Sequence, residues 1–270
     1  MQQYDTQALL EFASGLARQA GEVMRRYFYG DDMQVTTKAD NSPVTVADTT
    51  INRMLIEAVA ERFPEYGVLG EEASAHADRR ELWVCDPIDG TRGFIHGDPT
   101  AMFSLAFVVD GEPLLAVAYD PFQDRLFTAV KGRGAQCNGT ALHVSDQSPQ
   151  GAVIAGPGSL VELERGLEVY RDLRRQGMQV RLMAGGVFKM CLIASGRLDG
   201  RIFPGCFAHD LAAAKLIVEE AGGMVTDLRG AKQRYDGEIC GAIISNGVIH
   251  DVLVAAVKKA GVDNILGYGV

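Results

Sequence analysis

The sequence has few cysteines, a single tryptophan and a deficit of positive charge. Its 270 residues include five cysteines, one tryptophan, and 26 lysines and arginines against 35 aspartates and glutamates. The cysteine count is odd, the spacings are wide and no CxxC pair occurs, which argues against a disulfide framework or a zinc ribbon. The formal net charge of −9 argues against a basic surface that binds a nucleic-acid polymer.

Long apolar runs are also missing. No stretch of eighteen apolar residues occurs, so we expect no membrane-spanning helix and no membrane partner. Residues 1–15 lack the basic start and apolar stretch of a signal peptide. Most cysteines lie in apolar contexts that indicate core packing, and together these absences predict a cytoplasmic protein. The cysteines are Cys85, Cys137, Cys191, Cys206 and Cys240.

What is present begins with two helical patterns, followed by strands. Apolar residues recur at steps of three and four in residues 7–28 and 45–63, which predicts two amphipathic helices. Asp110–Pro113 predicts a hairpin turn, and residues 131–139 predict a tight turn, since they do not follow the spacing of a phosphate-binding loop. The strands predicted around these turns are Leu82–Cys85, Phe103–Val109, Leu114–Tyr119 and Arg125–Val130.

After about residue 150, short strands alternate with helical stretches. This alternation predicts a layered α/β half at residues 151–270 beside an N-terminal α+β half at residues 1–150. No low-complexity linker separates the halves, so we expect them to pack as one unit. The predicted strands are Ala152–Ala155, Arg181–Ala184, Arg201–Phe203, Met224–Thr226 and Ala242–Ser245; the predicted helices are 160–175, 187–195, 210–221 and 248–259.

Acidic residues gather at the end of the first predicted strand, in the segment WVCDPIDGT (residues 83–91). Each acid has an ordinary interpretation: solvated loop charges for Glu71-Glu72, a turn for Asp86 and Asp89-Gly90, and a helix N-cap for Asp210. Carboxylates that are brought together repel one another unless a cation neutralises them, and Mg²⁺ prefers oxygen ligands and often bridges to a phosphate. The pattern therefore indicates a magnesium site, with Gly90 and Thr91 beside it for an oxyanion.

These motifs resemble the inositol monophosphatase family of Mg²⁺-dependent, lithium-sensitive phosphomonoesterases. The resemblance is carried by GEE (70–72), DPIDGT (86–91) and the Asp210 block that ends at Gly223, with support from PVTVAD (43–48) and GRLDG (196–200). It implies a layered αβαβα sandwich, which agrees with the α/β rhythm, and a homodimer. It also implies hydrolysis of a small phosphate monoester by metal-activated water.

The resemblance implies a role for several residues. Glu71, Asp86 and the Ile88 carbonyl would hold one Mg²⁺, while Asp86, Asp89 and Asp210 would hold a second. A third, weaker ion would lie near Glu71. Thr91, with Asp48 behind it, and Glu71 would orient the attacking water, and the backbone of Gly90 and Thr91 would bind phosphate.

The chain departs from the family pattern around the substrate. His209 stands where Trp usually precedes the last metal aspartate, and it is either a packing residue or a polar contact. Phe203 replaces a glutamate that contacts an inositol hydroxyl, and Gly185 and Gly186 lie in a small-residue stretch that has lost its hydroxyl. Arg92 would reach either a second anionic group on the substrate or a surface carboxylate. These substrate contacts leave histidinol phosphate, 3′-phosphoadenosine 5′-phosphate and fructose 1,6-bisphosphate as alternative substrates.

Two further classes of function compete with this interpretation. A haloacid-dehalogenase-type phosphatase would use two aspartates that are two apart, whereas Asp86 and Asp89 are three apart. A non-catalytic protein that binds metal or phosphate and regulates a partner would not need the full set of acids that this sequence keeps.

Overall fold

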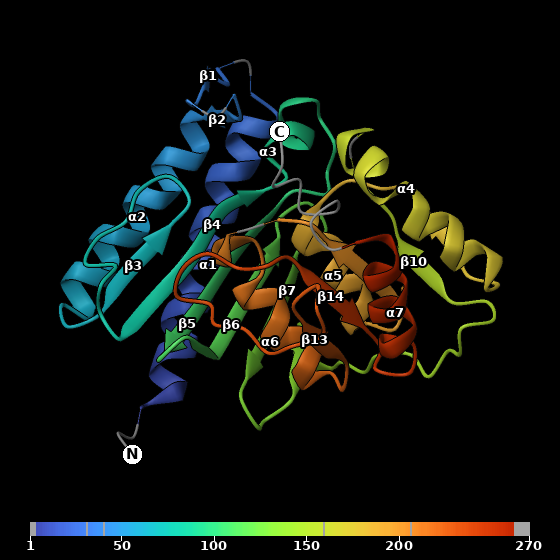
Figure 1. Ribbon diagram of the computed structural model, residues 1–270. Helices are drawn as coiled ribbons and strands as arrows, with labels where there is room; N and C mark the ends of the chain where they lie inside the picture. The colour runs from blue at the N-terminus through green and yellow to red at the C-terminus, as the bar shows by residue number, and fades with distance from the viewer. Residues whose placement is uncertain (1–3, 31, 40, 159, 206, 262–270) are drawn as a thin grey trace.

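The computed structural model describes residues 4–30, 32–39, 41–158, 160–205 and 207–261. Helices and strands stack in five layers, with a seven-stranded sheet and a five-stranded sheet separated by a pair of helices (Figure 1). The helices are α1 (Thr6–Phe28), α2 (Val46–Arg62), α3 (Thr91–Ile95), α4 (Leu160–Arg175), α5 (Gly186–Ala194), α6 (Ala212–Glu220) and α7 (His250–Ala260). This is the layered α/β sandwich that the sequence predicts.

The seven-stranded sheet has the order β3-β4-β5-β6-β7-β8-β9, and the five-stranded sheet has the order β11-β10-β12-β14-β13. A separate small sheet pairs β1 (Val35–Thr37) with β2 (Pro43–Thr45). The first sheet contains β3 (Gly67–Gly70), β4 (Glu81–Asp89), β5 (Met102–Val109), β6 (Glu112–Asp120), β7 (Arg125–Val130), β8 (Ala135–Cys137) and β9 (Thr140–Ala141). The second contains β10 (Val153–Ala155), β11 (Gln179–Arg181), β12 (Gly200–Phe203), β13 (Met224–Thr226) and β14 (Ala242–Ser245).

Side-chain alternation along β4 explains how the first sheet packs on both faces. Leu82 and Val84 belong to the apolar cluster that α5 and α6 complete between the two sheets. Trp83 and Cys85 belong to a second cluster with α1 and α2 on the opposite face. Because successive side chains of a strand point to opposite faces, one buried strand serves two cores. Helices α4 and α7 cover the outer face of the second sheet (Figure 1).

Several predictions of local structure are confirmed and others are wrong. The helices at 7–28 and 45–63 and the strands at 224–226 and 242–245 are confirmed. The strand predicted at Arg181–Ala184 is wrong beyond Arg181, because β11 pairs with β10 through Gln179–Arg181 and the chain then leaves the sheet. The hairpin turn contains only Asp110 and Gly111, whose φ values of 51° and 80° fit a primed two-residue turn, so Glu112 and Pro113 already belong to β6.

Two more predictions concern residues 131–139 and the cysteines. The tight turn is only part of that segment, because β8 forms within it and pairs with β7. Four cysteines are free, in agreement with the expected lack of a disulfide framework: Cys85, Cys137, Cys191 and Cys240. The fifth, Cys206, lies outside the described residues. Among the described residues, no helix is both long and apolar enough to cross a membrane. The division into halves at residue 150 remains a prediction.

Candidate active site

The DPIDGT segment forms the end of β4 and the turn that leads into α3. Between Asp86 and Asp89 the pairing with β5 shifts register, so the strand bulges around Pro87. A proline fits here because a bulge does not require its missing N–H donor, and bulges re-aim side chains next to functional sites. The Ile88 N–H donates to Asp86 Oδ1 at 3.0 Å, which helps to fix the first carboxylate.

Four carboxylates from three parts of the chain interact electrostatically at this strand end. Asp86 and Asp89 are buried, with exposed fractions of 2% and 6%. Burial, together with repulsion from Glu71, Asp89 and Asp210, raises the pKa of Asp86 well above its usual range. Burial raises the pKa of Asp89 to about 6, although the Arg201 guanidinium acts in the opposite direction. Glu71 follows β3 directly, and Asp210 closes the 3₁₀ turn η1 (Ala208–Asp210).

Asp210 does not cap α6. The residue preceding that helix is Leu211, and α6 has no side-chain capping bond. The prediction of a helix from residue 210 is therefore wrong at its start, and the N-cap interpretation of Asp210 fails. Burial and repulsion from Asp89 and Glu71 raise the pKa of Asp210 to about 8, so its carboxyl belongs electrostatically to the acidic group rather than to α6.

Lys38 supplies a positive charge to this group. Its Nζ donates to Glu71 Oε1 at 2.7 Å and to Glu72 Oε1 at 2.5 Å. Burial opposes the charge of Lys38, but these two hydrogen bonds outweigh it and raise the pKa of the ammonium group. Lys38 follows β1, and the sequence patterns gave no sign that its side chain would reach two glutamates after β3.

Asp48 and Thr91 meet as the family resemblance implies. The Thr91 hydroxyl lies 3.4 Å from Asp48 Oδ1 and 3.1 Å from the Ile88 carbonyl oxygen. Asp48 also completes a capping box at the start of α2, where it accepts from the Thr45 N–H at 2.8 Å. Burial raises the pKa of Asp48, while its bonds from Thr45 act against that rise. The helix cap thus holds Asp48 in place beside Thr91.

The start of α5 holds the second aspartate of the motif. The Val187 N–H donates to Asp89 Oδ2 at 2.8 Å. A Cβ added to Gly186 would lie 2.3 Å from Asp89 Oδ1, so only glycine allows this close approach. Gly186 thus allows the carboxylate to approach the start of α5.

A cavity of about 330 Å³ opens beside the acids. Four residues that were predicted to contact substrate line this cavity, namely Arg92, Gly185, Gly186 and Phe203. Its lining also includes Glu71, Asp89, Gly90 and Thr91. Arg92 is exposed and its Nη2 lies 3.5 Å from the Asn41 carbonyl oxygen. His209 does not line this cavity; its ring stacks on Phe207 with centroids 5.3 Å apart, and its Nε2 lies 3.9 Å from Asp210 Oδ1.

Two buried basic residues in this cavity were missed by the sequence patterns. Lys189 on α5 is 2% exposed and Arg201 on β12 is 3% exposed, and both line the cavity. A signal for Arg201 was available, because residues two apart on a strand share a face, and Arg201 stands two before Phe203. For Lys189 the helical pattern predicts burial but not which cavity its side chain reaches.

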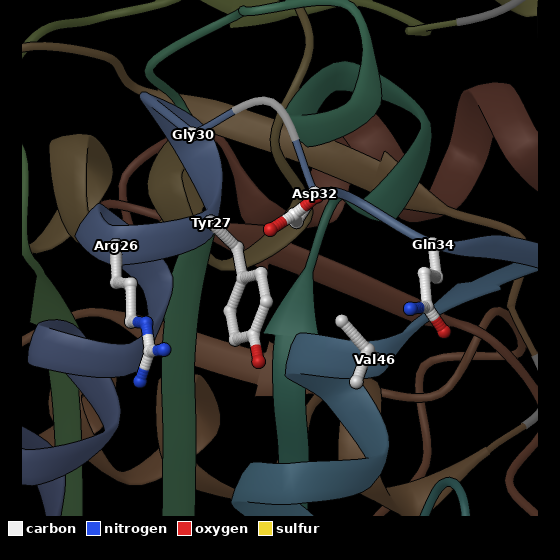
Figure 2. A pocket seen from close by; sticks show the side chains of 6 residues that line it. All are labelled: Arg26, Tyr27, Gly30, Asp32, Gln34 and Val46. Atoms are coloured by element: carbon white, nitrogen blue, oxygen red, sulfur yellow. The ribbon is translucent and has the colours of Figure 1, made fainter.

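A second cavity, of about 370 Å³, lies between the end of α1 and the start of α2. Figure 2 shows Arg26, Tyr27 and Asp32 around it, together with Gly30, Gln34 and Val46. Its single carboxylate and lack of clustered acids make it a poor candidate for the predicted metal chemistry.

The donor set at the end of β4 fits a hard divalent cation. Carboxylates with raised pKa values need a positive partner, and Asp86 and Asp210 offer the oxygen ligands that such a cation prefers. Within the described ranges, no three acidic, histidine or cysteine side chains already stand in metal-ligand geometry. The contacts of Lys38 with Glu71 and of Val187 with Asp89 engage oxygens that a cation would share.

Comparison with known proteins agrees with this fold. Residues 5–261 match the profile of the inositol monophosphatase family. Nus factor SuhB of Pasteurella multocida is 34% identical over 82% of this chain and 86% of its own. Inositol monophosphatase 1 of Bos taurus is 33% identical over 83% and 85%. The histidinol-phosphatase of Chlorobaculum parvum is 34% identical over 92% and 96%.

Solved structures give the same result. An inositol monophosphatase of Thermotoga maritima superposes with a TM-score of 0.84 at 31% identity, over 94% of this chain and 98% of the other. An inositol monophosphatase/NADP phosphatase in complex with Mg²⁺ and phosphate superposes with a TM-score of 0.82 at 25% identity, over 93% and 95%. The family and these relatives indicate a phosphatase, but they do not agree on one substrate.

Proposed function

We propose, from the premise that this chain belongs to the inositol monophosphatase family, that it hydrolyses a small phosphate monoester in a reaction that depends on Mg²⁺. The observation that carries the proposal is a group of carboxylates, in which Glu71, Asp89 and Asp210 repel Asp86, beside a cavity that Glu71 and Asp89 line. Repulsion within such a group is unfavourable unless a cation neutralises it. In a phosphatase, a bound cation can also activate water and neutralise the phosphate.

The protein's own residues would divide the work. Two or three Mg²⁺ ions would be held by Glu71, Asp86, the Ile88 carbonyl, Asp89 and Asp210. When bound, these ions neutralise charge on the phosphate and lower the pKa of water. The backbone of Gly90 and Thr91 would bind the phosphate. The Thr91 hydroxyl, held near Asp48, would orient the attacking water and pass its proton toward that carboxylate. Glu71 would accept a hydrogen bond from the same water.

Phosphate release tests the proposal directly. Purified protein is expected to release phosphate from a panel of small esters in Mg²⁺, to lose this activity in chelator and to be inhibited by Li⁺. Asp210→Asn should lower kcat/KM by about 100-fold or more, since even outer-shell groups of metal sites cost 10–100-fold. Asp78→Asn, which makes the same change at an exposed position, should not. Full activity in chelator would contradict the proposal.

The panel also separates the alternatives. It should contain inositol monophosphates, histidinol phosphate, 3′-phosphoadenosine 5′-phosphate and fructose 1,6-bisphosphate, because the relatives carry different substrate names. A regulatory role without catalysis has one support, the Nus factor name of a relative. Binding of ligand without turnover of any ester would favour that role. A cytoplasmic homodimer remains our expectation, and light scattering of the purified chain checks its mass.

A further inference from the structure

Arg201 is a buried cation at the wall of the cavity without an ion-pair partner among the described residues. It is 3% exposed and lines the same cavity as Glu71 and Asp89. Its Nη1 donates to the Gly186 carbonyl oxygen at 2.5 Å, and its guanidinium lies 4.8 Å from the centroid of the Phe203 ring. These two contacts fix the plane of the guanidinium at the cavity.

A guanidinium in this position still has binding capacity. It carries five N–H donors in a planar arrangement, whereas the described structure assigns one donor to a carbonyl oxygen. Burying such a charge without a paired anion is unfavourable. The charge of Arg201 is felt by Asp89 and Asp210, but neither carboxylate lies within ion-pair distance of it, and both are proposed ligands of Mg²⁺.

The cavity that Arg201 lines carries charges of both signs. Glu71 and Asp89 line it, and so do Lys189 and the exposed Arg92. Lys189 Nζ donates to the carbonyl oxygens of Gly156 at 3.2 Å and Met183 at 3.0 Å. Small residues also line the cavity and leave room for a substituent, namely Gly158, Ala184, Gly185 and Gly186.

We propose that Arg201, supported by Lys189, forms an anion subsite, and that the substrate is a phosphate monoester with a second anionic group. This inference rests on the proposed phosphatase function and narrows its substrate class. A neutral polyol phosphate would bring hydroxyls to a wall that offers a cation and a phenyl ring. A carboxylate or a second phosphate would accept paired hydrogen bonds from the planar guanidinium.

Matched pairs of esters test the subsite. 2-Phosphoglycerate differs from glycerol 2-phosphate by a carboxylate in place of a hydroxymethyl group, and fructose 1,6-bisphosphate differs from fructose 1-phosphate by one phosphate. We expect kcat/KM to be about tenfold or more higher for the anionic member of at least one pair, mainly through a lower KM. The pair that shows the preference identifies the group. Equal values in both pairs overturn the proposal.

Variants separate a substrate contact from a structural charge. Arg201→Gln should bring the ratio of kcat/KM values within the preferred pair close to one, and Arg201→Lys should retain part of it. Arg197→Gln, the same change at an exposed position, should keep the ratio of the unmodified protein. If Arg201 only balances Asp89 and Asp210, both esters will lose activity by the same factor, the ratio will not change, and the proposal is overturned.

The test does not depend on the variants or on turnover. If Arg201→Gln does not fold, the ratio of the unmodified protein and its decline with added salt decide the question, since a charged contact is screened. If no ester releases phosphate in Mg²⁺, the proposed function fails. Calorimetric Kd values for the same pairs then decide the subsite: a preference for the anionic member supports it, and equal Kd values overturn it.

Discussion

At the residue scale, Lys38 competes with cations for a proposed metal ligand. Its ammonium group holds Glu71 and Glu72, and about a fifth of the side chains of Lys38 and Glu71 is exposed. A partly exposed pair of this kind contributes up to about 1 kcal/mol. Any Mg²⁺ that binds Glu71 must displace the Lys38 ammonium group or bind the carboxylate beside it.

Lys38→Gln is therefore expected to tighten Mg²⁺ binding. Removal of the ammonium leaves the Glu71 carboxylate without this positive partner. The Mg²⁺ concentration for half-maximal activity should therefore fall by up to about fivefold, equivalent to about 1 kcal/mol. Lys131→Gln removes an exposed lysine that pairs with Glu112, and it serves as the control. Weaker Mg²⁺ binding in Lys38→Gln would show that Lys38 mainly positions Glu71.

The raised pKa values of two aspartates predict how stability depends on pH. The pKa of Asp89 is raised to about 6 and that of Asp210 to about 8, so the folded state binds more protons than the unfolded state between about pH 4 and 8. Their contribution to the free energy of unfolding is present below pH 4 and is lost as the pH rises through 6 and 8. Urea titrations in chelator should show this decline.

Excess Mg²⁺ should reduce that decline, because the cation binds the deprotonated carboxylates of the folded state. Asp210→Asn should flatten the pH dependence in chelator and lose much of the stabilisation by Mg²⁺. A free energy of unfolding that rises from pH 5 to 8 in chelator, or equal slopes with and without Mg²⁺, would contradict the proposed cluster.

At the element scale, the turn from β4 into α3 depends on a glycine. Gly90 precedes α3 with φ of 89° and ψ of 35°, the left-handed region that costs other L-residues about 1–2 kcal/mol. A Cβ at Gly90 would have its nearest neighbour at 3.7 Å, so backbone strain and not collision limits the position. The same turn places Gly90 and Thr91 beside the acids.

Gly90→Ala should thus lower both stability and activity, while Gly97→Ala should lower stability alone. Gly97 has φ of 78°, and a Cβ added there would meet no atom within 4 Å, so the strain is similar and the position lies outside the cavity. Chemical denaturation should show losses of about 1–2 kcal/mol for both variants. Phosphate release should fall only in Gly90→Ala; equal activities would remove Gly90 from the proposed phosphate site.

At the scale of the whole molecule, α5 and α6 pack between the two sheets and contact both of them. One apolar cluster runs from Leu82 and Val84 of β4 through Leu216 and Ile217 of α6 to Ile244 of β14. Because the inner faces of the two sheets share this cluster, neither half of the chain buries it alone. The acids proposed for the active site also come from both sides of residue 150, with Asp86 and Asp89 before it and Asp210 after it.

The shared core predicts a single unfolding transition. Calorimetry should give equal calorimetric and van't Hoff enthalpies. Leu216→Ala should lower the free energy of unfolding by about 2–5 kcal/mol while keeping one transition. Leu182→Ala, at a leucine that is 61% exposed, should have little effect. Two separate transitions would instead support independent halves at 1–150 and 151–270.

The sequence by itself determined the family and the amphipathic helices, and it predicted the acids that we propose for the site. These features depend on local spacing: a 3.6-residue period, a strand that ends in DPIDGT, and a glycine that permits the turn. The family resemblance is confirmed, and the layered fold that it implies is confirmed as well. The limits of several strands were wrong, as at Arg181–Ala184, because the end of a strand depends on the neighbour with which it pairs.

Tertiary structure alone decided which side chains meet. Lys38 reaches Glu71 and Glu72, Gly186 allows the approach of Asp89, and Arg201 and Lys189 turn into the cavity that Phe203 lines. The contacts of Lys38 and Gly186 do not follow from spacing along the chain, because the residues lie on different elements and are brought together by how the sheets and helices pack. Arg201 shares a strand face with Phe203, but the cavity that both residues line forms only when the sheets and helices pack. The sequence predicted the acids that we propose for the site, whereas the basic residues that line the same cavity required the fold.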